Sequence, residues 1–303
     1  MANKIMVSIE CTSYNHENFI AEALDSMLMQ RTNFTYEILI HDDASTDRTA
    51  KIIKSYEQKY PDIIKPIYQT ENQYSKGVLV EEFNLERAKG KYLAVCEGDD
   101  YWTDPDKLQK QVDYMETHPQ CSMCVHAAER VSAVTKKPVS VMRPSHKNKI
   151  FSVEEVIEGG GDLFATNSIL YSREKISEMP DFYLNATVGD YPLVIWGALN
   201  GTLCYIDQNM SAYRVDVKGS WTSVQVSDVA KKQKHLQEVA EMLDEINAFT
   251  NYKYNCVISR TKNRDRFYIL LKQMKIKETM KRGYRQFYMK PEFFKRVFKR
   301  ITI

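Results

Sequence analysis

The chain has 303 residues, 43% of them hydrophobic and 27% charged, and its 42 Lys and Arg nearly balance its 40 Asp and Glu. This composition supplies a sizeable core and excludes a wholly disordered chain. No run of roughly 18 apolar residues occurs, and residues 1–10 hold no apolar stretch of signal-peptide length, so neither a membrane span nor export is expected and the expected location is the cytoplasm.

The first part of the chain alternates short apolar runs with helical patterns. The apolar runs predict strands at residues 5–9, 36–40, 63–68 and 92–96. Between them, apolar residues at i, i+3 and i+4 spacing predict helices at 19–28, 45–60 and 81–89, with Ser45 or Thr46 capping the second helix and Pro61 ending it. Such alternation predicts an α/β fold with a mostly parallel sheet flanked by helices.

The later part continues this pattern and then becomes helical. A helix at 108–115, a strand at 122–127, a hairpin within 131–141, a strand at 168–171, a helix at 190–199 and a strand at 203–206 are predicted. From residue 224 the pattern is helical, with breaks near Thr250 and Pro291. We therefore predict a sheet domain at residues 1–222 and a basic helical C-terminal extension at residues 223–303.

Polar segments follow three of the predicted strands. They are residues 12–15, 42–47 and 97–101, and the last two contain paired aspartates. Ligands of parallel sheets bind outside the carboxyl ends of the strands, so these segments mark the candidate site.

The pair Asp99 and Asp100, directly after a buried strand, is the most informative of these features. Adjacent carboxylates repel each other, and a divalent cation that bridges one of them to a diphosphate would relieve that repulsion. Mg²⁺ and Mn²⁺ favour oxygen ligation with few protein ligands and substrate phosphates completing the shell. The alternative for the pair alone is a solvated turn before Pro105.

Three motifs occur in order: VSIECTSYN at residues 7–15, EILIHDDASTD at 37–47 and AKGKYLAVCEGDD at 88–100. Together they resemble family 2 glycosyltransferases, which have the GT-A (Rossmann-like) fold, over the chain up to about residue 215. The flavour is that of bacterial enzymes that build surface polysaccharides such as capsule. The resemblance implies a metal-dependent, inverting transfer of a sugar from a nucleotide-sugar donor, expected to be UDP-linked, to a glycan or polyprenyl-linked glycan acceptor.

The resemblance also implies roles for individual residues. Thr12 and Tyr14 would line the nucleotide base, with Tyr14 stacking on it, and Asp43 would bond the uracil edge. Asp99 would meet the ribose and Asp100 the metal, Mn²⁺ or Mg²⁺. Lys76 or Arg87 would approach the base or the phosphates. Asp42, Ser45 and Asp47 have an alternative role in holding their loop and capping the following helix.

Further roles fall on the segments after residue 187. In similar enzymes an acidic residue at the position of Asp190 is the general base, which removes the proton of the acceptor hydroxyl; the alternative is that Asp190 caps its helix. Arg214 would contact phosphate. Many relatives carry a metal-binding His where this chain has Asp216, and aspartate can also ligate a hard cation.

Acceptor contacts are less defined in the sequence. Asn167, Ser168, Trp102 and Trp196 are candidates for lining an acceptor pocket, although aromatic residues are more often part of the core. The Gln-x-x-Arg-Trp signature of processive synthases is absent, which favours the addition of a single sugar.

The C-terminal segment is strongly basic. From Arg260 onward, 15 Lys and Arg stand against three acidic residues, so this segment carries about +12 and the rest of the chain about −10. Aromatic residues such as Phe287 and Tyr288 interleave with the cations. Such a segment suits the anionic inner face of the plasma membrane, and packing against the body is the alternative. Nucleic acid is not an expected partner, because the body is acidic and no binding motif is present.

Two other function classes compete with sugar transfer. A nucleotidyltransferase that makes sugar nucleotides would usually carry a Gly-rich phosphate loop after the first strand, and residues 12–15 contain no glycine. A non-catalytic carbohydrate-binding or scaffold protein could retain the same fold, but the joint presence of Asp43, Asp99, Asp100 and Asp190 argues against it.

Overall fold

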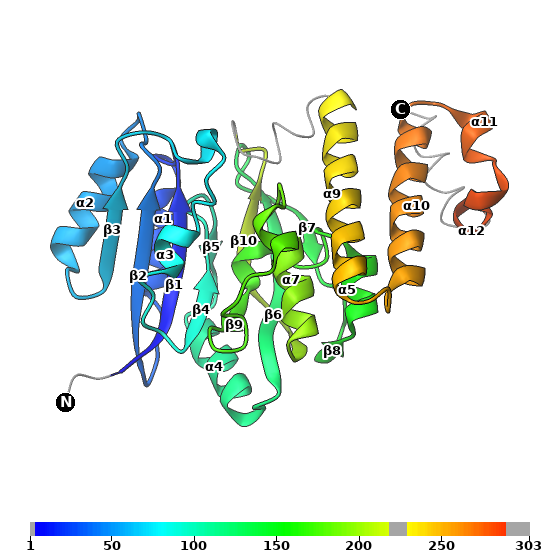
Figure 1. Ribbon diagram of the computed structural model, residues 1–303. Helices are drawn as coiled ribbons and strands as arrows, with labels where there is room; N and C mark the ends of the chain where they lie inside the picture. The colour runs from blue at the N-terminus through cyan, green and yellow to red at the C-terminus, as the bar shows by residue number, and fades with distance from the viewer. Residues whose placement is uncertain (1–3, 218–228, 289–303) are drawn as a thin grey trace.

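The computed structural model describes residues 4–217 and 229–288. A sheet of ten strands runs through the body in the order β3-β2-β1-β4-β9-β6-β10-β5, with β7 beside β6 and β8 beside β10 (Figure 1). The strands are β1 (Ile5–Ser13), β2 (Thr35–Asp42), β3 (Ile64–Tyr68), β4 (Tyr92–Val95), β5 (Tyr101–Trp102), β6 (Cys121–Ser132), β7 (Pro138–Met142), β8 (Lys149–Phe151), β9 (Leu170–Ser172) and β10 (Thr202–Val215).

Two groups of strands form the parallel part of this sheet. Strands β1, β2, β3 and β4 pair in parallel, as do β6 and β10. The short strands β5, β7, β8 and β9 pair antiparallel with their neighbours. The predicted α/β fold, a mostly parallel sheet flanked by helices with a helical C-terminal region, is confirmed.

Helices cover both faces of the sheet. They are α1 (Ile20–Leu28), α2 (Thr49–Lys59), α3 (Glu82–Leu85), α4 (Lys107–Thr117), α5 (Val153–Gly159), α6 (Asp181–Leu184), α7 (Asp190–Leu199), α9 (Val229–Phe249), α10 (Asn255–Lys272), α11 (Ile276–Thr279) and α12 (Arg285–Tyr288). Short 3-10 turns occur at η1 (Tyr74–Lys76), η2 (Thr166–Ser168) and η3 (Arg282–Tyr284).

Strand alternation builds a separate core on each face. In β2, Ile38 and Ile40 join one cluster, which contains the apolar faces of α1, α2 and α4. Leu39 points the other way into a cluster shared with α5, α6, α7, α9 and α10. Because successive side chains of a strand face opposite ways, β2 needs apolar residues at every one of these positions.

The structure differs from the sequence-based prediction in two instructive places. Strand β10 has 14 residues, whereas only residues 203–206 were predicted as strand. Its polar stretch near Asp207 and Asn209 interrupts the apolar pattern, and register shifts there let β10 keep pairing with β6 beyond the interruption. The predicted cap of α2 was also wrong: Asp47 Oδ1, and not Ser45 or Thr46, accepts the N–H of Thr49 at 2.8 Å.

The C-terminal helices are not all alike in how they pack. Helices α9 and α10 stand side by side next to the body (Figure 1), and residues such as Leu243 and Ile258 belong to the same buried cluster as α7. Beyond them, Tyr284 packs on Phe267 and Leu270 of α10 in a small separate cluster, together with Phe287 and Tyr288. The predicted boundary at residues 222–223 and the break at Pro291 lie outside the described residues.

A membrane-spanning helix was not expected from the sequence. Among the described residues, none of the helices combines the length and hydropathy that crossing a membrane requires.

One charged side chain lies wholly inside the core. Lys107, the first residue of α4, is fully buried, and its Nζ donates to Gln111 Oε1 at 2.8 Å while lying 4.0 Å from the centroid of the Trp102 ring. Burial lowers the pKa of Lys107 from its ordinary value to about 7, because water no longer solvates the ammonium ion. The amine is therefore mainly neutral above neutral pH.

We expect the stability of the wild type to rise with pH relative to that of Lys107→Met. Between about pH 7.5 and 9.5, Lys107 is protonated in the unfolded chain and neutral in the folded one, so unfolding takes up a proton and the free energy of unfolding rises by up to about 1.4 kcal/mol per pH unit. Urea unfolding at the two pH values measures this difference. Lys110→Met is the control, because Lys110 also lies on α4 but its amine is partly exposed and bonds Asp104. Parallel pH profiles for wild type and Lys107→Met would contradict the buried, neutral amine.

Candidate functional site

The polar segments after β1, β2 and β4 form one continuous edge. These strands are parallel neighbours, so their carboxyl ends lie together. The Gly98 N–H donates to the Thr12 carbonyl and the Asp43 N–H donates to the Ser13 carbonyl, both at 2.9 Å. Gly98 permits this close approach, because a Cβ there would lie 2.8 Å from Ser13 Oγ and 2.9 Å from His16 Nδ1. The sequence-based expectation that these segments come together is confirmed.

Asp100 is buried in this edge, with 1% of its surface exposed. Its Oδ1 accepts the backbone N–H of Arg214 at 2.7 Å, and its Oδ2 accepts Nδ2 of Asn167 at 3.1 Å. Burial, followed by the charge of Asp99, raises the pKa of Asp100 well above its ordinary value, while the Arg214 N–H acts in the opposite direction. The protein therefore holds this carboxyl group in place at an electrostatic cost.

Glu97 is a third carboxyl group at this edge, and the sequence interpretation did not single it out. Burial raises the pKa of Glu97 well above its ordinary value, and the charges of Asp99, Asp100 and Asp190 raise it further. The signal available in the sequence was an acidic residue immediately before Gly98. Two hydrogen bonds link Asp190 to this edge through η2: Asp190 Oδ2 accepts Thr166 Oγ1 at 3.4 Å, and the next residue, Asn167, donates to Asp100 Oδ2 at 3.1 Å.

These carboxyl groups fit a divalent cation that shares its shell with a substrate. With one hydrogen bond on each oxygen, Asp100 retains lone pairs for a cation. Mg²⁺ and Mn²⁺ take oxygen ligands and often use only one or two protein carboxylates beside phosphate oxygens. Within residues 4–217 and 229–288, no group of three His, Cys, Asp or Glu side chains is arranged to hold a metal ion by itself. An ion at Asp100 would thus depend on the diphosphate for the remaining ligands.

Asp216, the second predicted metal ligand, lies at the end of β10 with a positive φ of 64°. Its side chain accepts Ser132 Oγ at 3.3 Å, which ties it to the end of β6. The structure does not join Asp216 to Asp100 in a common cluster of metal-ligating side chains among the described residues. Its role as a metal ligand stays a prediction.

Arg214 is held by the protein itself. Its guanidinium donates to the backbone carbonyl of Asp99 and forms an ion pair with Glu22, and it lies 4.4 Å from the centroid of the Tyr101 ring and 5.0 Å from that of Phe19. Only 8% of the residue is exposed. The predicted phosphate contact would have to be made by a side chain that already has these partners, so the structure supports a bracing role for Arg214 beside Asp99.

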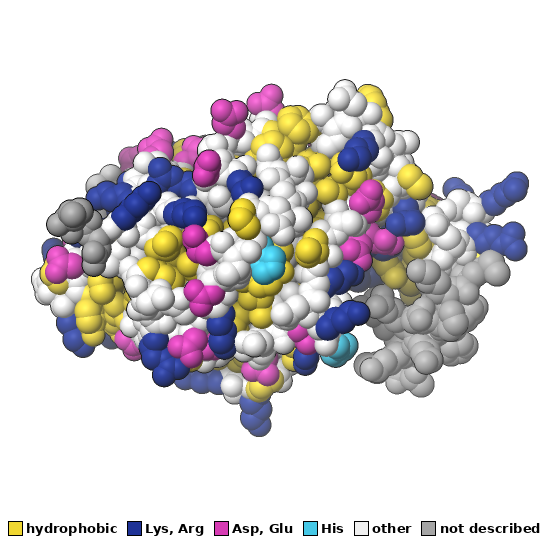
Figure 2. All heavy atoms as spheres, turned by 90° about the horizontal axis from the view of Figure 1, so that it is seen from below, with side chains coloured by type: hydrophobic (Ala, Val, Ile, Leu, Met, Phe, Trp, Pro, Cys, Tyr) yellow, Lys and Arg dark blue, Asp and Glu magenta, His cyan; other side chains and the backbone are white. Residues whose placement is uncertain are grey.

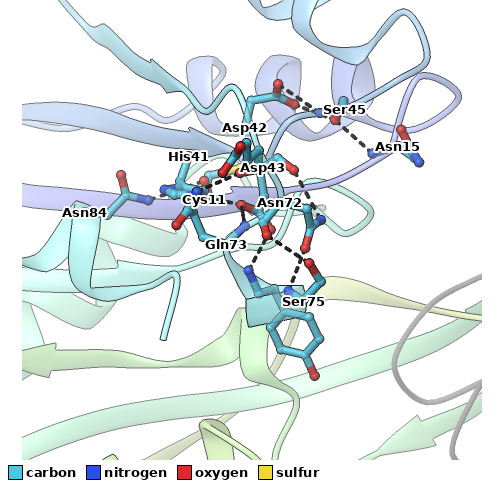
Figure 3. Close-up of polar contacts among 12 residues, drawn as sticks. Cys11, Asn15, His41, Asp42, Asp43, Ser45, Asn72, Gln73, Ser75 and Asn84 are labelled. Carbon is cyan, nitrogen blue, oxygen red and sulfur yellow. Dashed lines mark hydrogen bonds and ion pairs between the residues drawn. The ribbon is translucent and has the colours of Figure 1, made fainter. Parts of the chain in front are cut away.

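Asp43 is fixed by a neighbouring loop (Figure 3). Its Oδ1 accepts the backbone N–H of Gln73 at 2.7 Å and its Oδ2 accepts that of Tyr74 at 3.1 Å, while Asn72 Nδ2 donates to its carbonyl at 3.2 Å. His41, whose pKa is lowered by burial, lies with Nε2 3.4 Å from Oδ1 of Asp43. The turn η1 therefore forms one wall of the predicted base site, and Asp43 is its anchor.

The alternative structural roles of the residues around Asp43 are confirmed. Ser45 donates through Oγ to Asp42 Oδ1 at 2.5 Å, and the Asn15 N–H donates to Ser45 Oγ at 2.9 Å, which links the ends of β1 and β2 (Figure 3). Asp47 caps α2 through Thr49. These contacts hold the loop that carries Asp43.

The other residues predicted to bind the nucleotide-sugar differ in their exposure and in their existing partners. Thr12 is half-buried at the end of β1, and Tyr14 is 44% exposed just beyond it, as a ring that stacks on a base would need to be. Lys76 lies in η1, where it is half exposed and paired with Glu71. Arg87 points inward and donates to the Ile40 carbonyl at 3.0 Å, so it is bonded to β2 rather than presented at the edge.

Asp190 begins α7 next to this edge. Its Oδ1 accepts the N–H of Tyr191 at 2.7 Å, and its Oδ2 accepts Thr166 Oγ1 at 3.4 Å. Burial raises the pKa of Asp190 above its ordinary value, and these two hydrogen bonds lower it only in part. A carboxyl group with a raised pKa is a better proton acceptor than an ordinary aspartate, which is the property that a general base needs.

Three of the four residues considered for an acceptor pocket are buried. Trp102 is 1% exposed and donates through Nε1 to the Asn167 carbonyl at 2.9 Å, and Asn167 and Ser168 are fully buried. The acceptor hypothesis for these three residues was wrong, because their surfaces are enclosed in the core. Trp196 packs edge-to-face on Phe182 and Phe249, at centroid distances of 5.9 and 5.6 Å, and is only partly buried, so its acceptor role stays a prediction.

Comparison with known proteins places the chain in a family. The model for glycosyl transferase family 2 matches residues 8–176, more than half of the chain. An uncharacterized protein of Mycobacterium tuberculosis, Rv1520, is 38% identical over 218 residues, which are 72% of this chain and 61% of that protein. The chain thus spans about three fifths of the length of the curated relatives that it matches first.

A shorter match carries a functional name. The UDP-Glc:alpha-D-GlcNAc-diphosphoundecaprenol beta-1,3-glucosyltransferase WfaP of Escherichia coli is 37% identical over 113 residues, which are 37% of this chain and 42% of that protein.

Solved structures resemble the whole arrangement of strands and helices. S. aureus TarS 1-349 in complex with UDP-GlcNAc superposes with a TM-score of 0.62 at 16% identity, covering 95% of this chain and 77% of that one. The mannosyltransferase PcManGT from Pyrobaculum calidifontis, in complex with GDP-Man and Mn²⁺, gives a TM-score of 0.59 at 14% identity, covering 99% and 87%. Because the family model covers more than half of the residues and carries the motifs at the strand ends, this chain belongs to glycosyl transferase family 2 and has the GT-A fold.

Proposed function

We propose that this protein transfers one sugar, with inversion, from a nucleotide-sugar donor to a hydroxyl group of a glycan or polyprenyl-linked glycan during the synthesis of a bacterial surface polysaccharide such as capsule. The observation that carries the proposal is the link between Asp190 and the buried Asp100 through η2, where Thr166 bonds Asp190 and Asn167 bonds Asp100. Sugar transfer from a nucleotide-sugar needs a base for the acceptor hydroxyl and carboxylates that can share a divalent cation with the donor diphosphate.

The donor would lie across the ends of β1, β2 and β4. Asp43 would accept the N–H of a uracil edge, Tyr14 would stack on the base, and Asp99 would bond the ribose hydroxyls. Lys76 would approach the base or phosphates, and Arg214 would support the same region from β10. A UDP-linked donor is favoured by the relatives, since the name of WfaP includes UDP-Glc and the TarS complex contains UDP-GlcNAc.

A divalent ion at Asp100, with Asp216 as a further candidate ligand, would stabilise negative charge on the diphosphate leaving group. The chain's own contribution there is to hold the Asp100 carboxylate from two sides, by Arg214 N–H and Asn167 Nδ2. The PcManGT complex contains Mn²⁺, which supports Mn²⁺ as the first ion to test.

Asp190 would remove the proton from the acceptor hydroxyl as its oxygen attacks the anomeric carbon. The bond between that carbon and the diphosphate breaks on the opposite face, and the proton stays on the Asp190 carboxyl group. The hydrogen bonds from Thr166 and the Tyr191 N–H would orient the carboxylate for this step.

The basic C-terminal end suits contact with an anionic membrane surface, where a polyprenyl-linked acceptor would lie. Among the described residues, Met274, Ile276 and Met280 are exposed at 72%, 46% and 55%, and they alternate with Lys275, Lys277 and Lys281. Figure 2 shows Lys and Arg side chains at the end of the molecule where α11 and α12 lie. Apolar side chains interleaved with cations are typical of segments that lie on the inner face of a plasma membrane.

Donor binding is the first test. We expect UDP to bind more tightly than GDP and to bind measurably tighter with Mn²⁺ than without it in calorimetric titrations. Asp100→Ala should lose the manganese dependence, because the carboxylate that shares the ion with the diphosphate is gone. Asp113→Ala, an exposed aspartate of α4, is the matched control. Folded protein that binds neither nucleotide would favour a different donor or a non-catalytic protein.

The role of Asp190 predicts a separation of binding from chemistry. Asp190→Asn should keep the donor affinity and lower kcat by about 10²- to 10⁴-fold, because it removes the proton acceptor. In the wild type, kcat should rise with pH through a pKa above the ordinary aspartate value of about 4, since only the ionised carboxyl group accepts a proton and burial raises its pKa. Asp181→Asn, at the first position of α6, is the control. An active Asp190→Asn variant would point to another base.

Membrane contact is tested by vesicle sedimentation. The triple variant Lys275→Gln, Lys277→Gln and Lys281→Gln should release the protein from vesicles that contain anionic lipid, since each cation near such a surface contributes about 1 kcal/mol. The equivalent change of Lys51, Lys54 and Lys59 on α2 removes the same charge elsewhere and should leave sedimentation unchanged. If both variants sediment with anionic vesicles to the same extent, and no more than with neutral vesicles, packing is favoured over membrane contact.

A further inference from the structure

Asn167 connects three separate segments at the back of the site. Its Nδ2 donates to Asp100 Oδ2 at 3.1 Å and to the Ala212 carbonyl at 2.8 Å, and its Oδ1 accepts Ser211 Oγ at 2.7 Å. Its backbone carbonyl accepts the indole N–H of Trp102 at 2.9 Å. All of these contacts are buried.

The chemistry of its partners fixes the orientation of the Asn167 amide. A backbone carbonyl can only accept hydrogen bonds, so the amide atom that contacts both the Ala212 carbonyl and Asp100 must be the nitrogen. Turning the amide over would place Oδ1 against two acceptors and would leave the buried Asp100 oxygen without a donor. Both N–H groups of the amide are thus committed, one of them to Asp100.

The Asp100 carboxylate is consequently held at both oxygens. The Arg214 N–H on β10 binds Oδ1, and Asn167 in η2 binds Oδ2. Two donors on different elements define the plane of the carboxylate, and each oxygen keeps a further lone pair beyond these hydrogen bonds.

A second layer holds Asn167 in turn. Gln111 on α4 donates through Nε2 to the carbonyls of Ser168 and Cys124, both at 2.9 Å, and receives a hydrogen bond from Lys107. The backbone on both sides of the Asn167 side chain is therefore tied to α4 and β5. Such support is what keeps a liganding carboxylate in one orientation.

We propose that Asn167 is a positioning residue for Asp100: it sets the orientation of the carboxylate that shares a divalent cation with the donor diphosphate. The inference rests on the proposed function, because it requires that Asp100 meet the cation. Asn167 has none of its surface exposed, and its link to a bound donor is through the Asp100 carboxyl group to which it donates.

The test compares two deletions within the same buried network. Asn167→Ala removes the donor to Asp100, whereas Ser211→Ala removes the hydroxyl that bonds Asn167 Oδ1 and leaves the Asn167–Asp100 contact in place. Thermal unfolding shows the structural effect of each. The deciding readout is the Mn²⁺ concentration that gives half-maximal UDP binding in calorimetric titrations.

We expect both variants to lower Tm. Only Asn167→Ala should raise the half-maximal Mn²⁺ concentration. The expected rise is about 10- to 100-fold, the usual effect of losing a residue that orients a metal ligand. UDP affinity without Mn²⁺ should be the same in wild type, Asn167→Ala and Ser211→Ala. Asn167→Ser, which is too short to reach both Asp100 and Ala212, should shift the Mn²⁺ dependence in the same direction and replaces Asn167→Ala if that protein does not fold.

Three outcomes would overturn the inference. Manganese dependence equal to the wild type in Asn167→Ala or Asn167→Ser, with the wild type binding UDP normally, would reject Asn167 as a positioning residue and leave the proposed function intact. An equal shift in Ser211→Ala would reduce the effect to general loss of packing. Folded wild type that binds UDP without any influence of Mn²⁺ would reject both the cation at Asp100 and this inference.

Discussion

The crowding of carboxyl groups at one buried edge is the constraint on which the site depends. Glu97 and Asp100 have raised pKa values because burial and neighbouring negative charges disfavour their ionised forms. The fold offsets this in part with N–H donors, from the backbone of Arg214 and the amide of Asn167. A cation bound at this edge would therefore offset the remaining repulsion. Because such a ligand binds only the folded state, its binding would raise the free energy of unfolding.

Much of this edge could be predicted from the sequence, because Asp43 follows β2 directly, Asp100 lies in the segment after β4, and parallel neighbours bring such ends together. The supporting contacts could not. Asn167 and Arg214 meet Asp100 across 67 and 114 residues of sequence, and a local pattern does not specify which distant partner a polar side chain will find. For the same reason Trp102 was interpreted as an acceptor contact, although it supports Asn167 from within the core.

The first C-terminal helix, α9, packs against the body of the protein. Trp196 on α7 packs on Phe249 at the end of α9 at a centroid distance of 5.6 Å, so the helix that begins with Asp190 rests on the C-terminal region. The amino-acid composition predicts a separate C-terminal extension, but buried residues of α9 belong to the same hydrophobic cluster as residues of the sheet. Beyond α10, Tyr284, Phe287 and Tyr288 belong instead to a smaller cluster with Phe267 and Leu270 of α10.

The way Asp43 is held has a consequence for how the family's members diverge. The loop that fixes its carboxylate does so mainly with the main-chain N–H groups of Gln73 and Tyr74. Every residue except proline offers that group, so the side chains of this loop are free to vary while the anchor stays in place. Substitutions can therefore change the side chains of the wall next to Asp43 and keep the contact that fixes it, whereas a proline or a deletion at these two positions removes the contact itself.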